Sequence, residues 1–196
     1  MEAIVNRFRL GSLTVLAGVV ALLVGVLAPA SAAGSARAPY CGLVWGSLPE
    51  SSAASAAGLE VTDVRAGRHA CFDRLVVDLR GPAAATGYSV RYVDTVHQVG
   101  TGTPIALDGG AALEVIVRAP AYDRYGRATY LPPSRGDVVD VDGFRTFEQV
   151  AWAGSYEGST TLGIGTRARL PFRTFTLVGA PGDDAVRVVI DVAHRW

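Results

Sequence analysis

The stretch Arg74–Leu79 reads RLVVDL, and Arg187–Val192 repeats it as RVVIDV. Each copy has the order Arg, aliphatic, Val, aliphatic, Asp, aliphatic, so apolar residues recur with the period of two that is typical of a β-strand. The two copies therefore predict two core strands of one β-domain. The expected inward positions are Leu75, Val77 and Leu79 in the first copy and Val188, Ile190 and Val192 in the second.

The charged residues of each copy lie on the opposite face from these inward positions. Arg74 and Asp78 are four residues apart, as are Arg187 and Asp191, so within each strand both charges share one face. We expect them to pair with charges on neighbouring strands. The repeat is compatible with two strands of one sheet and with strands of two related sheets.

From Leu59 onward the chain alternates short strand patterns with turn signals. The spacing is that of a β-sandwich or barrel, and no extended helical period occurs beyond the N-terminal region, so the predicted fold is mainly β, a single β-sandwich-like domain. Phe147–Ala153 is compatible with a short helix or a strand, and Phe172, Phe175 and Leu177 are expected in the core. The other strand patterns lie in Leu59–Gly67, Cys71–Gly81, Gly87–Val99, Ala111–Pro120, Thr160–Thr166, Leu170–Gly179 and Ala185–His194.

The first 32 residues have the features of a secretory signal peptide. Arg7 and Arg9 precede the uncharged apolar stretch Leu13–Leu27, and Ala28–Ala32 reads APASA, a small-residue cleavage pattern. An uncleaved anchor is the alternative. The expected organisation is a signal peptide at 1–32, a flexible segment at 33–58 tethered through Cys41, and a β-domain at 59–196.

Charge and cysteine content indicate which partners are excluded and whether a disulfide is expected. The chain has 18 basic and 18 acidic residues, so it offers no strongly basic surface for nucleic acid or membrane lipid. Once the signal is removed, we expect no stable membrane insertion. Cys41 and Cys71 are the two cysteines, and in an exported chain they predict a disulfide, with two free buried thiols as the alternative.

Four stretches together resemble the AMIN-like domain of secreted and lipid-anchored bacterial envelope proteins. They read VRAGRHACFDRLVVDL, GYSVRYVD, PFRTFTL and RVVIDVAH, and the resemblance extends over about Val61 to His194. This family is distantly similar to the AMIN domain that precedes cell-wall amidase domains and secretins. The resemblance implies a β-sandwich, a cell-envelope location and, by analogy, peptidoglycan binding.

The motifs required for catalysis or for a cofactor do not occur. His69, His97 and His194 lie in different segments without an HExxH pair, and no GxSxG motif places a nucleophilic serine. The glycine stretches GTGTP at 100–104 and GIGTR at 163–167 do not form a phosphate-binding loop and are typical of hairpins or bulges. We therefore expect no catalytic residue, metal or cofactor.

Acidic clusters are the remaining candidates for metal chemistry. They are typical of solvated turns, with a weak calcium site as the alternative interpretation. The clusters are Asp137, Asp140 and Asp142, and the pair Asp183 and Asp184.

The irregular segment Ala121–Asp137 and two aromatic residues soon after it carry the candidate binding surface. Aromatic side chains with a polar group suit sugars and peptides, and arginine suits the carboxylates of peptidoglycan stems. The alternative is that several of these tyrosines fill the ends of the sandwich. The candidate residues are Tyr122, Arg124, Tyr125, Arg127, Tyr130, Trp152 and Tyr156.

The sequence thus predicts a secreted or cell-wall-associated module without catalytic activity, which binds peptidoglycan or another wall polymer. A protein-interaction module of the envelope that binds a secreted envelope protein is the first alternative. A hydrolase whose site converges around His97 or His69 is the second.

Overall fold

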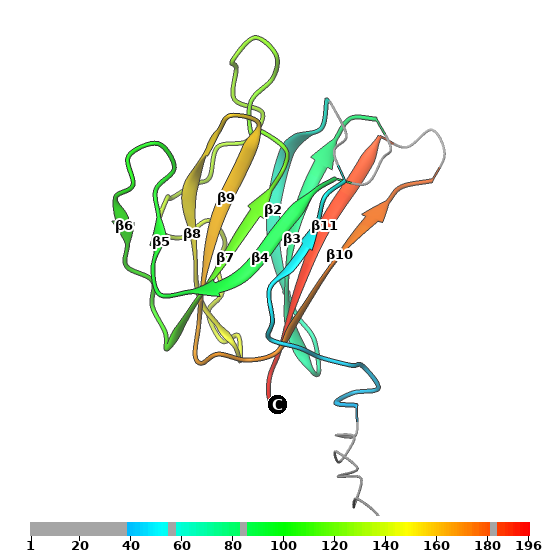
Figure 1. The fold of residues 1–196 in the computed structure, drawn as a ribbon, viewed down its shortest axis with the longest axis vertical. Coiled ribbons are helices and arrows are strands. Elements are labelled where there is room, and N and C mark those ends of the chain that lie inside the picture. The colour runs from blue at the N-terminus through cyan, green and yellow to red at the C-terminus, as the bar shows by residue number, and fades with distance from the viewer. Residues whose placement is uncertain (1–38, 55–57, 83–85, 181–183) are drawn as a thin grey trace, which may run out of the picture. The chain divides into compact units, whose positions relative to one another are not determined.

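The computed structural model describes residues 39–54, 58–82, 86–180 and 184–196 (Figure 1). The signal peptide expected at 1–32 and Asp183 lie outside these ranges. Eleven strands occur in the described residues, and none of these residues forms a helix, which confirms the mainly β fold. The strands are β1 (Glu50–Ser52), β2 (Glu60–Arg68), β3 (Phe72–Arg80), β4 (Tyr88–Val93), β5 (Val96–His97), β6 (Pro104–Ile105), β7 (Ala111–Val117), β8 (Phe147–Tyr156), β9 (Ser159–Thr166), β10 (Phe172–Val178) and β11 (Ala185–Ala193).

The strands form two main antiparallel sheets and a short ribbon. One sheet has the order β1-β4-β7-β9-β8, the other has the order β10-β11-β3-β2, and β5 pairs with β6. Figure 1 shows the two main sheets as two layers. Buried aliphatic residues from both layers form one core cluster, which includes Leu75 and Ile190 from one sheet and Leu113 and Leu162 from the other. The domain is therefore a β-sandwich.

The two repeats of the sequence are neighbouring central strands of the four-stranded sheet. β3 and β11 pair in antiparallel register, so that Arg187 lies opposite Asp78 and Asp191 lies opposite Arg74. All six expected inward positions are at most 2% exposed and belong to the core cluster. The alternation of the repeats thus divides each strand into a core face and a charged outer face.

Strand β10 departs from the expected core assignment. Phe172 is buried, but Phe175 lies over the arginines of the outer face and Leu177 is 43% exposed. Because side chains alternate along a strand, residues 172 and 175 cannot share a face. The expectation that Phe175 and Leu177 lie in the core is therefore wrong. Threonines 174 and 176 hold the inward positions after Phe172 in this edge strand.

The segment Phe147–Ala153, for which the sequence allowed a helix, lies within strand β8. β8 forms a long hairpin with β9, with register shifts at Phe147/Gln149 and Trp152/Gly154. The irregular segment that precedes β8 runs alongside its outer edge, since Val138 donates to the carbonyl of Val150 and Trp152 donates to that of Arg135. These bonds satisfy backbone groups at an edge of the sheet.

Two glycines in β9 allow the chain after β6 to cross the five-stranded sheet closely. A Cβ atom at Gly165 would lie 2.0 Å from the carbonyl oxygen of Asp108, and one at Gly163 would lie 3.0 Å from Leu107 Cδ1. Since both positions have negative φ, they require glycine for space and not for backbone conformation. The first four residues of the GIGTR stretch therefore lie inside strand β9, where another segment approaches closely, and the expectation of a hairpin there is wrong.

The described residues before β2 are fastened to both sheets. β1 pairs with β4, the amide of Phe172 in β10 donates to the carbonyl of Gly46, and the amide of Thr174 donates to Glu50 Oε2. Burial raises the pKa of Glu50, partly offset by this hydrogen bond. The expected disulfide between Cys41 and Cys71 is confirmed and joins this segment to the start of β3.

Replacing both Cys41 and Cys71 by serine should lower the free energy of unfolding by about 3 to 4 kcal/mol, since the bridge closes a loop of 30 residues and restricts the unfolded chain. Urea unfolding of both proteins, with and without reductant, measures this difference. Reductant should bring the natural protein to the stability of the double variant and leave the variant unchanged. Equal stability of the two oxidised proteins would contradict the prediction.

Gly165→Ala should lower the free energy of unfolding by about 1 to 3 kcal/mol, because the new methyl group must displace the main chain at Asp108. The matched control is Gly46→Ala, where no atom lies within 4 Å of the added Cβ. Thermal and urea unfolding of both variants give the comparison. The close approach of the two segments would be refuted if both variants were equally stable.

Candidate functional site

Four of the candidate aromatic residues line one surface hollow of about 370 Å³. Tyr122 and Tyr130 come from the segment after β7, and Trp152 and Tyr156 come from the second half of β8. Gln98, Val99 and Thr101 of the turn between β5 and β6 border the hollow, and Arg135 and Leu131 complete it. We call this site the aromatic hollow.

The local fold places Tyr122 and Tyr130 at the hollow by a small hairpin. Tyr122 forms a bridge with Ala128, and the amide of Thr129 donates to the carbonyl of Ala121. The amide of Ala121 donates to Ser155 Oγ, and the Tyr122 hydroxyl accepts from the amide of Gly158. The irregular segment is thus bound to the β8–β9 hairpin, and its aromatic side chains are held by main-chain contacts.

The four aromatic residues differ in exposure. Trp152 is 7% exposed and belongs to the core cluster, and Tyr130 packs against it with ring centroids 5.6 Å apart. Burial, followed by the charge of Asp63, raises the pKa of Tyr130. Tyr156 is 57% exposed. Trp152 and Tyr130 therefore fill the edge of the sandwich, whereas Tyr156 presents its ring to solvent.

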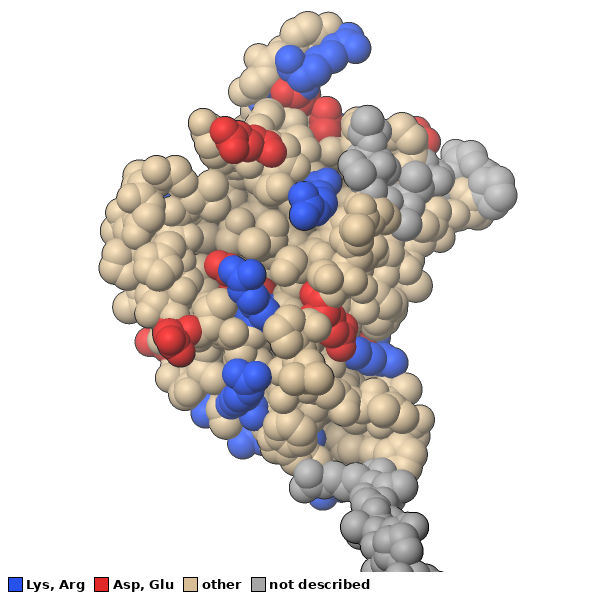
Figure 2. All heavy atoms as spheres, in the orientation of Figure 1, with Lys and Arg blue, Asp and Glu red and all other residues tan. Residues whose placement is uncertain are grey.

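The other three candidate residues lie at the tip of a protruding loop, outside the lining of the hollow. Arg124 and Arg127 both stack on the Tyr125 ring, at 4.7 and 5.1 Å from its centroid, and Arg127 pairs with Asp123. Desolvation acts to raise the pKa of Asp123, but hydrogen bonds from Arg127 and Tyr125 outweigh it and hold the pKa below its usual value. Figure 2 shows this basic tip.

A second cluster, which the sequence reasoning treated as structural pairs alone, lies on the outer face of the four-stranded sheet. Arg74 donates from Nε and Nη2 to the two oxygens of Asp191, at 2.6 and 2.9 Å, and Arg173 Nε donates to the same carboxylate at 2.8 Å. Asp78 is shared in the same way by Arg65 and Arg187. We call these four arginines and two aspartates the arginine face.

Aromatic rings support the guanidinium groups at one end of this face. Arg74 lies 5.1 Å from the ring centroid of Phe72 and 5.7 Å from that of Phe175, and Arg173 contacts the same two rings and Trp45. The side chain of Asp191 is completely buried beneath its two arginines. Stacking and bidentate pairing hold these guanidiniums in place before any ligand arrives.

Asp73 and His194 form a buried pair at the end of the sandwich. His194 Nε2 lies 3.0 Å from Asp73 Oδ1, while Asp73 Oδ2 accepts from the amides of Thr146 and Phe147. Arg167 donates to the carbonyl of His194. These contacts tie the C-terminal strand to the start of β8. They give the pair a role in holding the fold, and it faces no hydroxyl or thiol nucleophile among its hydrogen-bond partners in the described chain.

The three histidines lie in separate segments of the chain. His69 is exposed and stacks on Phe72, and His97 is exposed on the β5–β6 ribbon. No group of three or more His, Cys, Asp or Glu residues that could hold a metal ion occurs within the described ranges.

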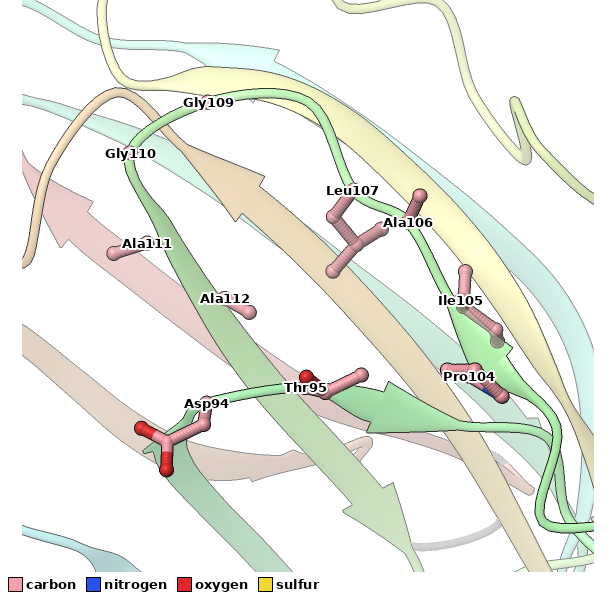
Figure 3. A pocket seen from close by; sticks show the side chains of 10 residues that line it. All are labelled: Asp94, Thr95, Pro104, Ile105, Ala106, Leu107, Gly109, Gly110, Ala111 and Ala112. Carbon is pink, nitrogen blue, oxygen red and sulfur yellow. The ribbon is translucent and has the colours of Figure 1, made fainter.

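A groove of about 450 Å³ lies beside the β5–β6 ribbon (Figure 3). Its lining consists of small or aliphatic side chains and main chain, from Pro104–Leu107 on one side and Gly109–Ala112 on the other. Asp94 is the one charged residue in this lining. The groove therefore offers few groups that could orient a ligand, and the aromatic hollow and the arginine face are the better candidates.

The fold and these surfaces define a class of protein: a disulfide-linked antiparallel β-sandwich with an aromatic hollow and an arginine face on its surface. The family model of the AMIN-like domain matches residues 59–194, and the chain belongs to this family. Membership indicates a cell-wall-associated module of the envelope or periplasm, and domains of this family are generally not catalytic. None of the curated proteins and none of the solved structures that were compared matches the chain.

In the described residues, the structure contains no helix that is long and apolar enough to span a membrane.

Asp191→Asn should lower the free energy of unfolding by about 1.5 to 3 kcal/mol, because two arginines lose a buried anionic acceptor. Asp78→Asn should cost less, since Asp78 and its partners Arg65 and Arg187 are more exposed and water replaces the lost contact. Urea unfolding of the two variants at neutral pH measures both effects. A larger loss for Asp78→Asn would contradict the assignment of Asp191 as the main anchor.

Proposed function

We propose that the chain is a secreted, non-catalytic module of the cell envelope that binds peptidoglycan, or another wall polymer, through the aromatic hollow. The observation that carries this proposal is the gathering of four aromatic side chains from two chain segments around one hollow of about 370 Å³. That volume lies within the range of small-ligand sites. Family membership supports the wall association.

The chemistry of the hollow suits a sugar ring. Tyr156 and Tyr122 combine an apolar ring face with a hydroxyl, so they can stack on the carbon face of a saccharide and bond its rim. Gln98, Thr101 and Arg135 add donors and acceptors around the opening. The apolar floor is rigid, since Trp152 is part of the core and Tyr130 packs on it.

The basic loop tip adds charge complementarity to the same proposal. Arg124 and Arg127 both stack on the ring of Tyr125, and Arg127 also pairs with the carboxylate of Asp123. Their remaining donors face solvent and can bind carboxylates of a polymer that extends beyond the hollow.

The absence of a catalytic assignment rests on the buried pair. The Asp73 carboxylate accepts two amide hydrogen bonds and contacts His194. Asp73 is completely buried and His194 is 7% exposed, so the pair is not accessible to a wall polymer.

Tyr156→Ala should weaken binding to purified peptidoglycan sacculi about threefold to tenfold, because a stacking contact of about 0.5 to 1.5 kcal/mol is lost. Co-sedimentation of residues 33–196 with sacculi measures the dissociation constant. Tyr156 has more than half of its side chain exposed, so the substitution should leave the unfolding temperature unchanged.

Trp196→Ala is the matched control, since Trp196 is an exposed aromatic residue outside the hollow. It should bind sacculi like the natural protein. Recovery of the natural protein with sacculi at no more than the level of an inert secreted protein would overturn peptidoglycan binding. Equal losses in both variants would overturn the assignment to the hollow.

A second candidate function is the binding of another envelope protein by strand addition. β10 is an edge strand, and its last two residues, Leu177 and Val178, are exposed. Such an edge can pair with an extended segment of another chain. Retention on walls that still carry their proteins, with loss after protease treatment of those walls, would favour this function over polymer binding.

A further inference from the structure

The outer face of the four-stranded sheet contains three adjacent rows of side chains that run across the strands. The first row contains Arg74, Asp191 and Arg173, and the third contains Asp63, Asp78, Arg187 and Leu177. Between them lies a row that is apolar in its centre. This middle row reads Arg65, Val76, Val189 and Phe175 from β2 to β10. The face is therefore an apolar strip between two rows of arginine and aspartate.

A groove of about 300 Å³ follows this strip. Three guanidinium groups line it, from Arg65, Arg74 and Arg187, and His69 lies at its edge. Val76 and Val189 are buried and form its floor, and Leu177, which is 43% exposed, provides the aliphatic surface. No carboxylate belongs to this lining in the described part of the chain, because Asp78 and Asp191 contact the arginines outside the groove.

Positive charge is in excess in the lining of the groove, which contains three arginines and no carboxylate. Around it, the four arginines of the arginine face share the carboxylates of Asp78 and Asp191, and Asp63 near Arg65 and Glu50 near Arg173 add two further negative charges. The ion pairs neutralise only part of the guanidinium charge, and they hold each guanidinium in a defined position. A site whose donors are already ordered binds an anion with little further loss of conformational entropy.

We propose that this groove binds an extended acidic peptide of about three to four residues, with carboxylates near both of its ends. The two charged rows are four residues apart along the strands, which corresponds to about 13 Å. An extended peptide of three to four residues covers that distance at about 3.3 Å per residue. Its carboxylates would bind Arg74 and Arg187, and its small aliphatic side chains would contact the exposed side chain of Leu177.

This inference rests on the proposed function in one respect: the stem peptides of peptidoglycan are the wall component with this chemistry. The groove is a second site. Its lining residues differ from those of the aromatic hollow and belong to the other sheet. The hollow is lined by β8 of the five-stranded sheet and by residues next to it, whereas the groove is lined by all four strands of the other sheet.

The test uses the tetrapeptide glutamyl-alanyl-alanyl-glutamate and residues 33–196 of the protein in isothermal titration calorimetry. Arg74→Gln and Arg187→Gln should each weaken binding by at least about tenfold, as expected for loss of a hydrogen bond to a charged group. Each variant loses one ion pair but leaves one arginine on the same aspartate, Arg173 on Asp191 or Arg65 on Asp78, so neither aspartate is left without a partner. Binding should also weaken as salt increases.

Leu177→Glu is a second variant that leaves the arginines intact. Leu177 is 43% exposed at the edge of the groove, so the new carboxylate is tolerated by the fold and should repel the peptide. Arg91→Gln is the control for net charge, because Arg91 lies on β4 of the other sheet and pairs with Glu114. This control should bind the tetrapeptide normally.

Three outcomes would overturn the assignment. These are equal binding of the tetrapeptide by all variants, equal binding of a peptide with amidated carboxylates, or tighter binding of a glycerol phosphate polymer than of the tetrapeptide. Failure of the tetrapeptide with intact, Tyr156-dependent binding to sacculi would reject the groove alone. Tetrapeptide binding in the groove without binding to sacculi would reject the proposed function alone.

Discussion

The antiparallel pairing of β3 with β11 is the constraint on which the rest of the structure depends. Because the two strands carry the same six-residue pattern in opposite directions, each arginine meets the aspartate of the other copy. A shift of one residue would turn the buried valines and leucines to solvent and bring the charges into the core. The repeat therefore fixes strand register through hydrophobic burial and ion pairing together.

In the five-stranded sheet, two glycines leave space for a segment that crosses it. Gly163 and Gly165 remove two side chains from the outer face of β9, and the chain after β6 crosses there in close contact. The β5–β6 turn that precedes this crossing lies next to β8, where the amide of Val99 donates to the carbonyl of Ala153. Gly154 of β8 leaves room for Val99 there, since a Cβ atom at Gly154 would lie 3.3 Å from Val99 Cβ.

Alternation along the sequence predicted the class of fold and the inward residues of the repeats, because burial on one face of a strand leaves a period of two. The same rule places Phe172 and Phe175 of β10 on opposite faces of the sheet, and only Phe172 is buried in the core. The arginine face was missed for a different reason. The parity of Arg65, Arg74, Arg173 and Arg187 can be read from the sequence, but their meeting on one surface requires the strand order β10-β11-β3-β2.

Composition does not predict the structural roles of the seven candidate binding residues. Seven residues share one irregular region and the strand after it, yet the fold assigns them three roles: core for Trp152, hollow lining for Tyr156, and loop tip for Arg124. Main-chain bonds from the 121–135 segment to β8 and its hairpin turn decide between these roles, and such contacts have no local sequence signature. In the proposed function, binding energy at this end of the domain therefore comes from exposed rings such as Tyr156, while the buried rings determine how rigidly those contacts are held.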